Sequence, residues 1–218
     1  MVEHITTIQY YGHDLFVVKT SSGLRILTDP YNKWVKPKLP AVEADIILIS
    51  HDHDDHNNLS IVKNYKKIIK GFGEFKYEDV VFKGFKTFHD ESGGAQRGLN
   101  TVFLFTADGI TFAHMGDLGK IPDDAILNEL KDVDVIFIPV GGGPTIDAGQ
   151  AVKLISTLMP KVAIPMHFKL SEFAAIPFTY IDKFLDLVKE YREFRESVQI
   201  SVETLPSSTQ VWYIKPID

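Results

Sequence analysis

The chain has 218 residues, a formal net charge of −6, eight histidines and no cysteine. This length suits one substantial hydrophobic core, so we expect a single domain over residues 1–218. The acidic balance argues against a nucleic-acid partner, no apolar run approaches the ~20 residues that cross a bilayer, and the lack of cysteine excludes thiolate metal ligands.

The N-terminal residues lack a basic segment followed by an apolar one, so we expect no secretory signal and a cytoplasmic protein. Residues 4–29 alternate in a strand-like way around a turn at Ser21-Ser22-Gly23, which is typical of strands that open a sheet. Residues 30–43 contain three prolines and are expected to form a loop. Trp34 in that loop is either a surface anchor or a wall of a substrate site.

The most informative stretch follows the apolar residues 46–49. Three histidines and three aspartates fill six consecutive positions from His51 to His56. Alternate side chains of an extended segment point the same way, so His51 and His53 can bind one divalent ion. Asp55 and His56 can reach a second ion after the chain bends. A solvated loop that caps a strand is the plainer interpretation, but a run without Ser, Gly or Lys favours a metal site.

Asn57 or Asn58 is next expected to cap a helix over residues 59–67, followed by a strand that starts at 68–70. Further strands are predicted over residues 79–83 and 85–88, and the second of them ends on His89. A lone histidine is more often satisfied by ordinary hydrogen bonds. Its place at a strand end, in order with the other motifs, favours a ligand.

The glycine-rich loop after His89 contains three candidate substrate contacts, Gln96, Arg97 and Asn100. Arg97 is the only one of them that suits a phosphate or a carboxylate. A surface loop with an ordinary arginine is equally consistent with this sequence.

Residues 101–106 and 110–113 flank Ala107-Asp108-Gly109, which is the pattern of a β-hairpin. The second strand leads to His114-Met115-Gly116-Asp117. A carboxylate bridges two cations through its two oxygens more readily than a histidine does, so Asp117 suits a position between two sites. His114 suits a hydrogen-bonding role behind the ligands.

The remaining residues alternate helix and strand, which marks a mixed or parallel sheet covered by helices. Helices are expected over residues 123–130, 147–158 and 179–195, and strands over 133–140, 162–165, 198–202 and 211–214. The stretch Gly141-Gly142-Gly143-Pro144 lacks the Gly-Lys-Ser/Thr ending of a phosphate loop, so we expect a rim loop with Thr145 or Asp147 capping the next helix. Composition and periodicity alone predict an α/β or α+β fold.

The motifs together resemble those of the metallo-β-lactamase superfamily. The residues that carry the resemblance follow one another along the chain: Gly12-His13, Thr28-Asp29-Pro30, His51-x-His53-x-Asp55-His56, Phe88-His89-Asp90, Gly116-Asp117 and Pro165-Met166-His167-Phe168. The resemblance implies a four-layer αββα sandwich, in which two mixed β-sheets are flanked by helices. It is closest to the short metal-dependent hydrolases related to the L-ascorbate-6-phosphate lactonases.

The resemblance also implies a binuclear site with two divalent ions, zinc first, with manganese, iron or nickel as alternatives. In that site His51, His53 and His89 hold one ion, Asp55, His56 and His167 hold the other, and Asp117 bridges them. Asp55 is expected to act as ligand and to orient a metal-bound hydroxide. His13 is expected to be a proton donor, an extra ligand or a structural residue. Asp29 is expected to hydrogen-bond near the ligands, or simply to shape the turn before Pro30.

The implied reaction is hydrolysis of an ester, lactone or phosphoester of a small molecule. A nuclease or phosphodiesterase of the same superfamily and a non-catalytic metal-binding module are the alternatives. The C-terminal third is rich in Leu, Phe and Ile and could form either the face of a homo-oligomer or part of the core.

Overall fold

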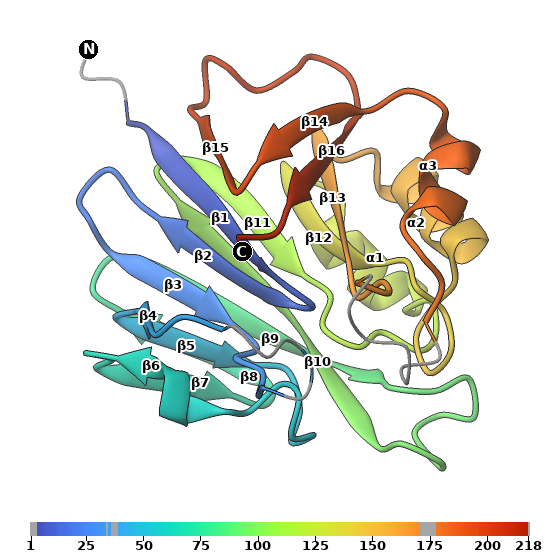
Figure 1. The fold of residues 1–218 in the computed structure, drawn as a ribbon, viewed down its shortest axis with the longest axis horizontal. Coiled ribbons are helices and arrows are strands. Elements are labelled where there is room, and N and C mark those ends of the chain that lie inside the picture. Colours follow the sequence, from blue (N-terminus) through green and yellow to red (C-terminus); the bar gives the residue numbers. More distant parts are fainter. Residues whose placement is uncertain (1–3, 34, 36–38, 171–177, 218) are drawn as a thin grey trace.

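Two β-sheets form the centre of the protein in a computed structural model that describes residues 4–33, 35, 39–170 and 178–217 (Figure 1). Trp34 lies outside these residues. The smaller sheet has six strands, in spatial order β15 (Ser197–Ile200), β1 (Thr6–Gly12), β2 (Leu15–Lys19), β3 (Arg25–Thr28), β5 (Ile46–Ile49) and β7 (Lys67–Lys70). The strands from β15 to β3 pair antiparallel, whereas β3, β5 and β7 pair parallel.

The larger sheet has eight strands, in spatial order β14 (Arg192–Arg195), β16 (Gln210–Lys215), β13 (Val162–Met166), β12 (Val135–Pro139), β11 (Ile110–His114), β10 (Leu99–Ala107), β9 (Val80–Phe88) and β8 (Gly73–Tyr77). Neighbouring strands pair antiparallel from β8 through β9 and β10 to β11. They pair parallel from β11 through β12, β13 and β16 to β14. The two mixed sheets and the predicted hairpin are therefore confirmed.

The strands β2, β3 and β5 of the six-stranded sheet are buried on both faces, as the uninterrupted apolar sequence of β5 suggests. Ile46 and Leu48 point into the core between the two sheets, while Ile47 and Ile49 belong to a second apolar cluster on the outer face. Successive side chains of a strand point to opposite faces, so four consecutive aliphatic residues require cover on both sides.

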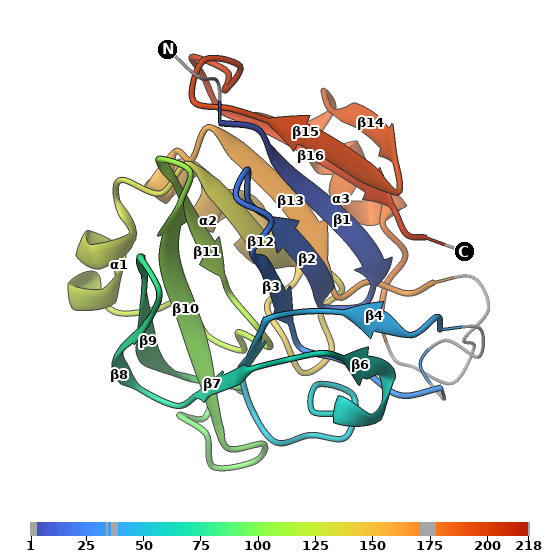
Figure 2. The same cartoon turned by 90° about the vertical axis from the view of Figure 1, so that its left-hand side faces the viewer.

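The cover on the outer face is not an α-helix. It consists of the 3₁₀ turn η1 (Leu59–Ile61), the short strands β4 (Val42–Glu43) and β6 (Val62–Lys63), and loop residues that include Tyr31 and Leu39 (Figure 2). The helix predicted over residues 59–67 is therefore wrong. Asn58 does cap a turn, but Val62 pairs with Val42, and Asn64 takes a left-handed conformation with φ 64° that ends any helix.

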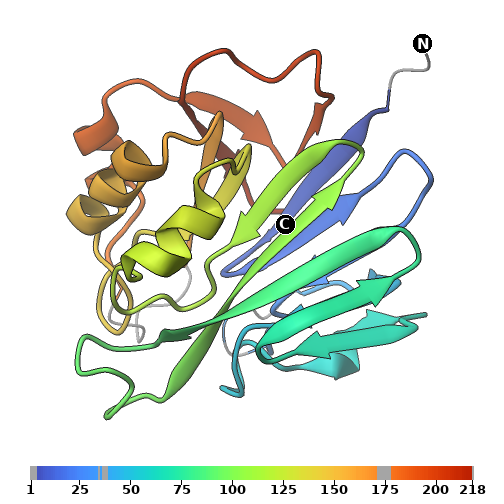
Figure 3. The same cartoon turned by 180° about the vertical axis from the view of Figure 1, so that it is seen from behind.

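Within the described residues, three helices cover the larger sheet: α1 (Asp124–Leu130), α2 (Ala148–Leu158) and α3 (Asp182–Val188) (Figure 3). Asp123 caps α1, and Asp147 caps α2 in a reciprocal capping box with Gln150. Both starts agree with the prediction. None of the helices in the described part of the chain is long and apolar enough to span a membrane.

The predicted helix over residues 179–195 is wrong in its second half. The helix α3 ends at Val188, Lys189 has a φ of 64°, and residues 192–195 form β14 beside β16. Phe194 packs on Trp212 with ring centroids 5.1 Å apart, a contact that a sequence window cannot anticipate.

The strands predicted over residues 79–83 and 85–88 are one strand, β9, and the pairing strand β8 was missed. Gly84 does not interrupt β9. A Cβ atom at this position would lie 2.2 Å from the carbonyl oxygen of Gly71, so glycine here permits a close approach of two backbones.

The outer apolar cluster can be tested with two register partners. Ile47 in β5 is fully buried, whereas Ile68 opposite it in β7 is 37% exposed. Ile47→Ala should lower the free energy of unfolding by about 2–5 kcal/mol, and Ile68→Ala by about 0.5 kcal/mol, in urea denaturation of the metal-free protein. Equal losses would contradict the assignment of a packed core to this face.

Candidate metal centre

The polar residues of the centre stand at the ends of strands from both sheets. The strands β1, β3 and β5 run in one direction within the smaller sheet, and β9, β11 and β13 do so within the larger one. Ligands of open sheets gather at the carboxyl ends of strands. The first polar residues after these six strands are His13, Asp29, Ser50, His89, Asp117 and His167.

A first group contains His51, His53, His89 and the carboxylate of Asp117. His53 Nδ1 lies 3.0 Å from His51 Nε2 and 3.2 Å from His89 Nε2. Asp117 Oδ2 lies 3.0 Å from His89 Nε2 and 3.7 Å from His51 Nε2. Tetrahedral zinc with bonds of about 2.0–2.1 Å requires ligand atoms about 3.3 Å apart. The four donor atoms therefore fit one such ion.

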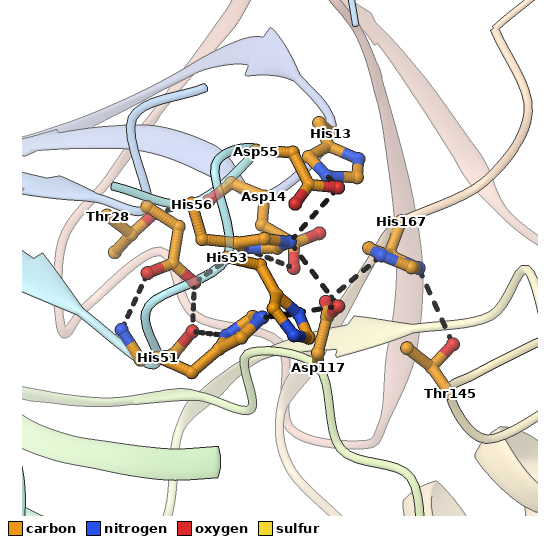
Figure 4. A network of polar contacts seen from close by, with 12 residues as sticks. His13, Asp14, Thr28, His51, His53, Asp55, His56, Asp117, Thr145 and His167 are labelled. Atoms are coloured by element: carbon orange, nitrogen blue, oxygen red, sulfur yellow. Dashed lines mark hydrogen bonds and ion pairs between the residues drawn. The ribbon is translucent and has the colours of Figure 1, made fainter. Parts of the chain in front are cut away.

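A second group lies on the other side of Asp117 and contains His56, His167, Asp55 and His13. His167 Nε2 is 3.0 Å from Asp117 Oδ1, and His56 Nε2 is 3.3 Å from Asp117 Oδ2 (Figure 4). Asp55 Oδ2 is 3.9 Å from His56 Nε2 and 3.4 Å from His13 Nε2. Asp117 thus contacts imidazoles of both groups, which is the position expected of a bridging carboxylate.

Several nitrogen and oxygen atoms of the centre that could bind a metal are buried and have no hydrogen-bond partner within the described residues. They are His13 Nε2, both oxygens of Asp14, both nitrogens of His56, His89 Nδ1, Asp117 Oδ1 and His167 Nε2. Buried polar atoms are normally satisfied, and each exception costs about 1–3 kcal/mol. A divalent cation is the partner that imidazole nitrogens and carboxylate oxygens share, so this donor set fits a metal centre.

The ionisation of the histidines is set first by burial. Burial lowers the pKa of His51 to about 2, with a further contribution from His56, and lowers that of His13 to about 4 against the opposing effect of Asp55. Neutral imidazoles have a free nitrogen lone pair for a metal. For His56, burial is outweighed by the carboxylates of Asp117 and Asp29, which raise its pKa.

Asp29 lies behind the ligands and holds them in place. Its carboxylate accepts hydrogen bonds from the backbone N–H and the hydroxyl of Ser50, both at 2.7 Å, and from His114 Nε2 at 2.8 Å. His56 Nδ1 is 3.3 Å away. Burial opposes ionisation of Asp29, but His114 and His56 outweigh it and hold the pKa well below its ordinary value. Asp29 therefore links His56 to the start of the metal motif.

Three of these residues adopt left-handed backbone conformations: His13 with φ 52°, Asp29 with φ 36° and His167 with φ 52°. Non-glycine residues rarely do so. Hydrogen bonds fix them. For example, the carbonyl of His13 accepts from the Tyr10 hydroxyl at 2.9 Å and from the backbone N–H of His167 at 3.2 Å.

Asn100 lies behind Asp117 and not on the open side of the centre. It is 1% exposed, and its amide donates to Thr87 Oγ1 and to the carbonyl of Met115 while its oxygen accepts from the backbone N–H of Asp117. All of its polar groups are used by the protein. Its contribution is to position Asp117, rather than the substrate contact that the sequence suggested. Gly116 permits this arrangement, because a Cβ there would lie 2.5 Å from Asn100 Oδ1.

Gln96 and Arg97 lie in a loop that Asp90 organises. The Asp90 carboxylate accepts backbone hydrogen bonds from Gly94, Gln96 and Arg97 at 2.8–3.0 Å. The loop borders a cavity of about 570 Å³, which is also lined by Thr145, a neighbour of His167 Nδ1 at 3.5 Å. The role of Asp90 was not predicted, although an aspartate before a glycine-rich loop is a signal for such a turn.

Arg97 also lines a second recess of about 410 Å³ beside His51 and His53, together with Lys70, Phe72 and Leu99. Lys70 pairs with Asp52. The guanidinium of Arg97 has no ion-pair partner in the part of the chain that the structure describes. It is thus a free positive charge next to the first ligand group.

Asp14 is the ligand-type residue that sequence analysis missed entirely. It follows His13 in the turn between β1 and β2, is fully buried, and has Oδ2 3.6 Å from His56 Nδ1. Burial and the nearby Asp117 raise its pKa well above the ordinary value. A charged residue next to Gly12-His13 in a strand connection was the available signal, but such connections usually face solvent.

Comparison with known proteins agrees with this geometry. Residues 7–167 match the family model described as a beta-lactamase superfamily domain. A UPF0173 metal-dependent hydrolase of Carboxydothermus hydrogenoformans is 30% identical over 190 residues, covering 74% of this chain and 84% of the relative. A UPF0173 metal-dependent hydrolase of Bacillus cereus is 28% identical and covers 88% of this chain and 99% of its own.

Among solved structures, a candidate zinc-dependent hydrolase of the metallo-β-lactamase superfamily from Thermotoga maritima superposes with a TM-score of 0.81. It is 30% identical and covers 97% of this chain and 100% of its own. The similarity in sequence and in structure thus extends over nearly the whole length of both chains.

The role of Asp29 in orienting the ligands can be tested by measuring the affinity of the protein for Zn²⁺. Asp29→Asn should weaken Zn²⁺ binding by about 10–100-fold, because loss of a residue that orients a ligand has effects of this size. Asp52→Asn is the matched control, since Asp52 stands inside the same motif but is exposed, and it should change affinity by less than about twofold. A competition titration with a chromophoric chelator measures both. The same affinity in both variants would contradict the role given to Asp29.

Proposed function

Because the chain belongs to the metallo-β-lactamase superfamily and, within it, to the UPF0173 metal-dependent hydrolases, we propose that it hydrolyses an ester, lactone or phosphoester bond of a small molecule at a centre of two divalent ions. The observation that carries this proposal is the carboxylate of Asp117, whose two oxygens lie within 3.0–3.7 Å of histidines in both ligand groups. Zinc is the first candidate for both ions, in view of the imidazole-rich donor set.

The proposed ligands divide between two positions. They are His51, His53 and His89 for the first ion, Asp55, His56 and His167 for the second, and Asp117 for both. When bound, such ions lower the pKa of coordinated water to about 7 and polarise the oxygen of the bond that is cleaved.

Asp55 and His13 are the residues proposed to handle protons. Burial alone would raise the pKa of Asp55, but His13 and His56 lower it, so the carboxylate is ionised and can accept a proton at Oδ2. His13 Nε2 lies 3.4 Å from that oxygen, within reach of a proton relay toward a leaving group. Asp55 retains 19% exposure of its side chain, whereas His13 has 2%, so Asp55 is the one that borders solvent.

The substrate is proposed to carry an anionic group, which favours a lactonase-like or phosphoesterase-like reaction on a small polar molecule. The unpaired Arg97 lines both the cavity beside Thr145 and the recess beside His51 and His53, and it can bind a carboxylate or a phosphate through two parallel hydrogen bonds. Phe72 and Leu99, which are 43% and 41% exposed, offer an apolar surface next to it.

Metal removal tests the reaction directly. Protein stripped with a chelator should lose at least about 10³-fold in kcat/KM on whichever of a lactone, a carboxylic ester, a phosphomonoester and a phosphodiester the native enzyme cleaves, and Zn²⁺ or Mn²⁺ should restore it. Asp117→Ala should cause a comparable loss, while His4→Ala, at an exposed histidine, should not. Activity that survives chelation would overturn the proposal. Tight metal binding without turnover on any substrate would favour a binding module, and turnover confined to the phosphodiester would favour the phosphodiesterase alternative.

Arg97 provides a test of the substrate class. Arg97→Ala should raise KM for an anionic substrate about tenfold with little change in kcat, because the lost interaction exists in both the ground state and the transition state. Arg97→Lys should recover part of the loss. Arg195→Ala, at an exposed arginine on β14, is the control. An identical KM increase for a neutral ester of the same shape would argue against anion recognition.

A further inference from the structure

We infer that Asp14 is a direct ligand of the second ion, alongside His56, His167 and Asp117. This inference rests on the proposed two-ion centre but not on the reaction. Asp14 is 0% exposed, and neither of its oxygens accepts a hydrogen bond from the described residues. A buried carboxylate is found with hydrogen bonds, a paired charge or a metal. Within the described residues, the polar neighbours of Asp14 are His56, at a long distance, and the carboxylate of Asp117.

The contact with His56 does not account for Asp14. Its Oδ2 lies 3.6 Å from His56 Nδ1, whereas Asp29 Oδ2 lies 3.3 Å from the same nitrogen and also holds Ser50 and His114. Asp29 therefore suffices to orient the His56 ring. The remaining neighbour of Asp14 is the carboxylate of Asp117, and a cation between the two carboxylates would stabilise both.

The position of Asp14 fits a ligand. One donor atom from each of Asp14, His56, Asp117 and His167 can be chosen so that all four lie within 4.8 Å of one another. Ligand atoms on opposite sides of one ion, with bonds of about 2.0–2.2 Å, are about 4.2 Å apart, so a small inward adjustment closes the group around a single cation. Figure 4 shows Asp14 beside His56, on the side of the centre where His13 and Asp55 also lie.

The backbone conformation directs the side chain of Asp14 into the protein. Gly12 has φ 103° and His13 has φ 52°, so the chain turns sharply between β1 and β2, where the strand register also shifts. The carbonyl of Asp14 accepts a hydrogen bond from Thr28 Oγ1 at 2.6 Å. This bond, with those to the His13 carbonyl, fixes both residues of the turn and leaves the Asp14 carboxylate within the protein.

The charges around the centre are compatible with a metal ligand at Asp14. Four carboxylates face the centre, those of Asp14, Asp29, Asp55 and Asp117, and each is paired only with histidines within the described residues. Two divalent ions would supply four positive charges, and their attraction would stabilise a buried carboxylate at this position.

The experiment is a count of bound metal after dialysis against buffered Zn²⁺, by inductively coupled plasma mass spectrometry, with Kd values from competition titration. The wild type should retain two equivalents. Asp14→Asn keeps the shape of the side chain and should retain one, with the Kd of the weaker ion raised by more than about 100-fold, beyond the effect of a residue that only orients a ligand. His167→Ala should lose the same equivalent, and the double variant should lose nothing further.

Asp52→Asn is the control that removes an exposed carboxylate of the same motif and should retain two equivalents. Two equivalents with an unchanged second Kd in Asp14→Asn would overturn the inference, as would a wild type that binds only one ion. Anomalous diffraction from Zn²⁺-soaked wild-type crystals decides the matter if the variant does not fold. An Asp14 oxygen about 2.0–2.2 Å from the second ion supports the ligand role, and a separation above about 3 Å refutes it. A protein that binds two ions in this way but cleaves no substrate would refute the hydrolase proposal alone.

Discussion

The contact of Asp117 with four imidazoles is the interaction on which the rest of the structure depends. Those imidazoles belong to His51, His56, His89 and His167, which follow strands of both sheets. One short side chain can reach all four only if the ends of the two sheets meet within a few ångströms. The face-to-face packing of the sheets, the buried Asn100 behind Asp117 and the close approach at Gly116 all serve that condition. The residues of the metal centre therefore connect the two sheets.

Part of this centre was predictable from a local pattern, because the run from His51 to His56 combines ligand-type side chains after an apolar strand. His89, Asp117 and His167 follow predicted strands, but they were identified as ligands by their order along the chain, which resembles that of the metallo-β-lactamase superfamily. The helices expected over residues 59–67 and 179–195 failed for a different reason. Their residues are helix-compatible in isolation, but pairing of Val62 with β4 and of residues 192–195 with β16 decides their conformation.

Asp14 and Asn100 could not have been assigned from sequence, because their roles depend on burial by residues distant in the chain. A carboxylate in a strand connection is normally a solvated turn residue, and an asparagine after a glycine-rich loop normally contacts solvent or substrate. These side chains are placed in the interior by the hydrogen bond between the turns that follow β1 and β13 and by the pairing of β10 with β11. Residue chemistry indicates what a side chain can bind, and tertiary packing decides whether it does.

The left-handed conformations of His13, Asp29 and His167 bear on how this fold can vary. Glycine would adopt such angles at lower energy than a histidine or an aspartate. A related chain that no longer binds metal would tend to gain stability if glycine replaced these three residues. Retaining a histidine or an aspartate at all three places sacrifices stability for metal chemistry, and inactive descendants of this protein should be recognisable by glycine where these side chains now stand.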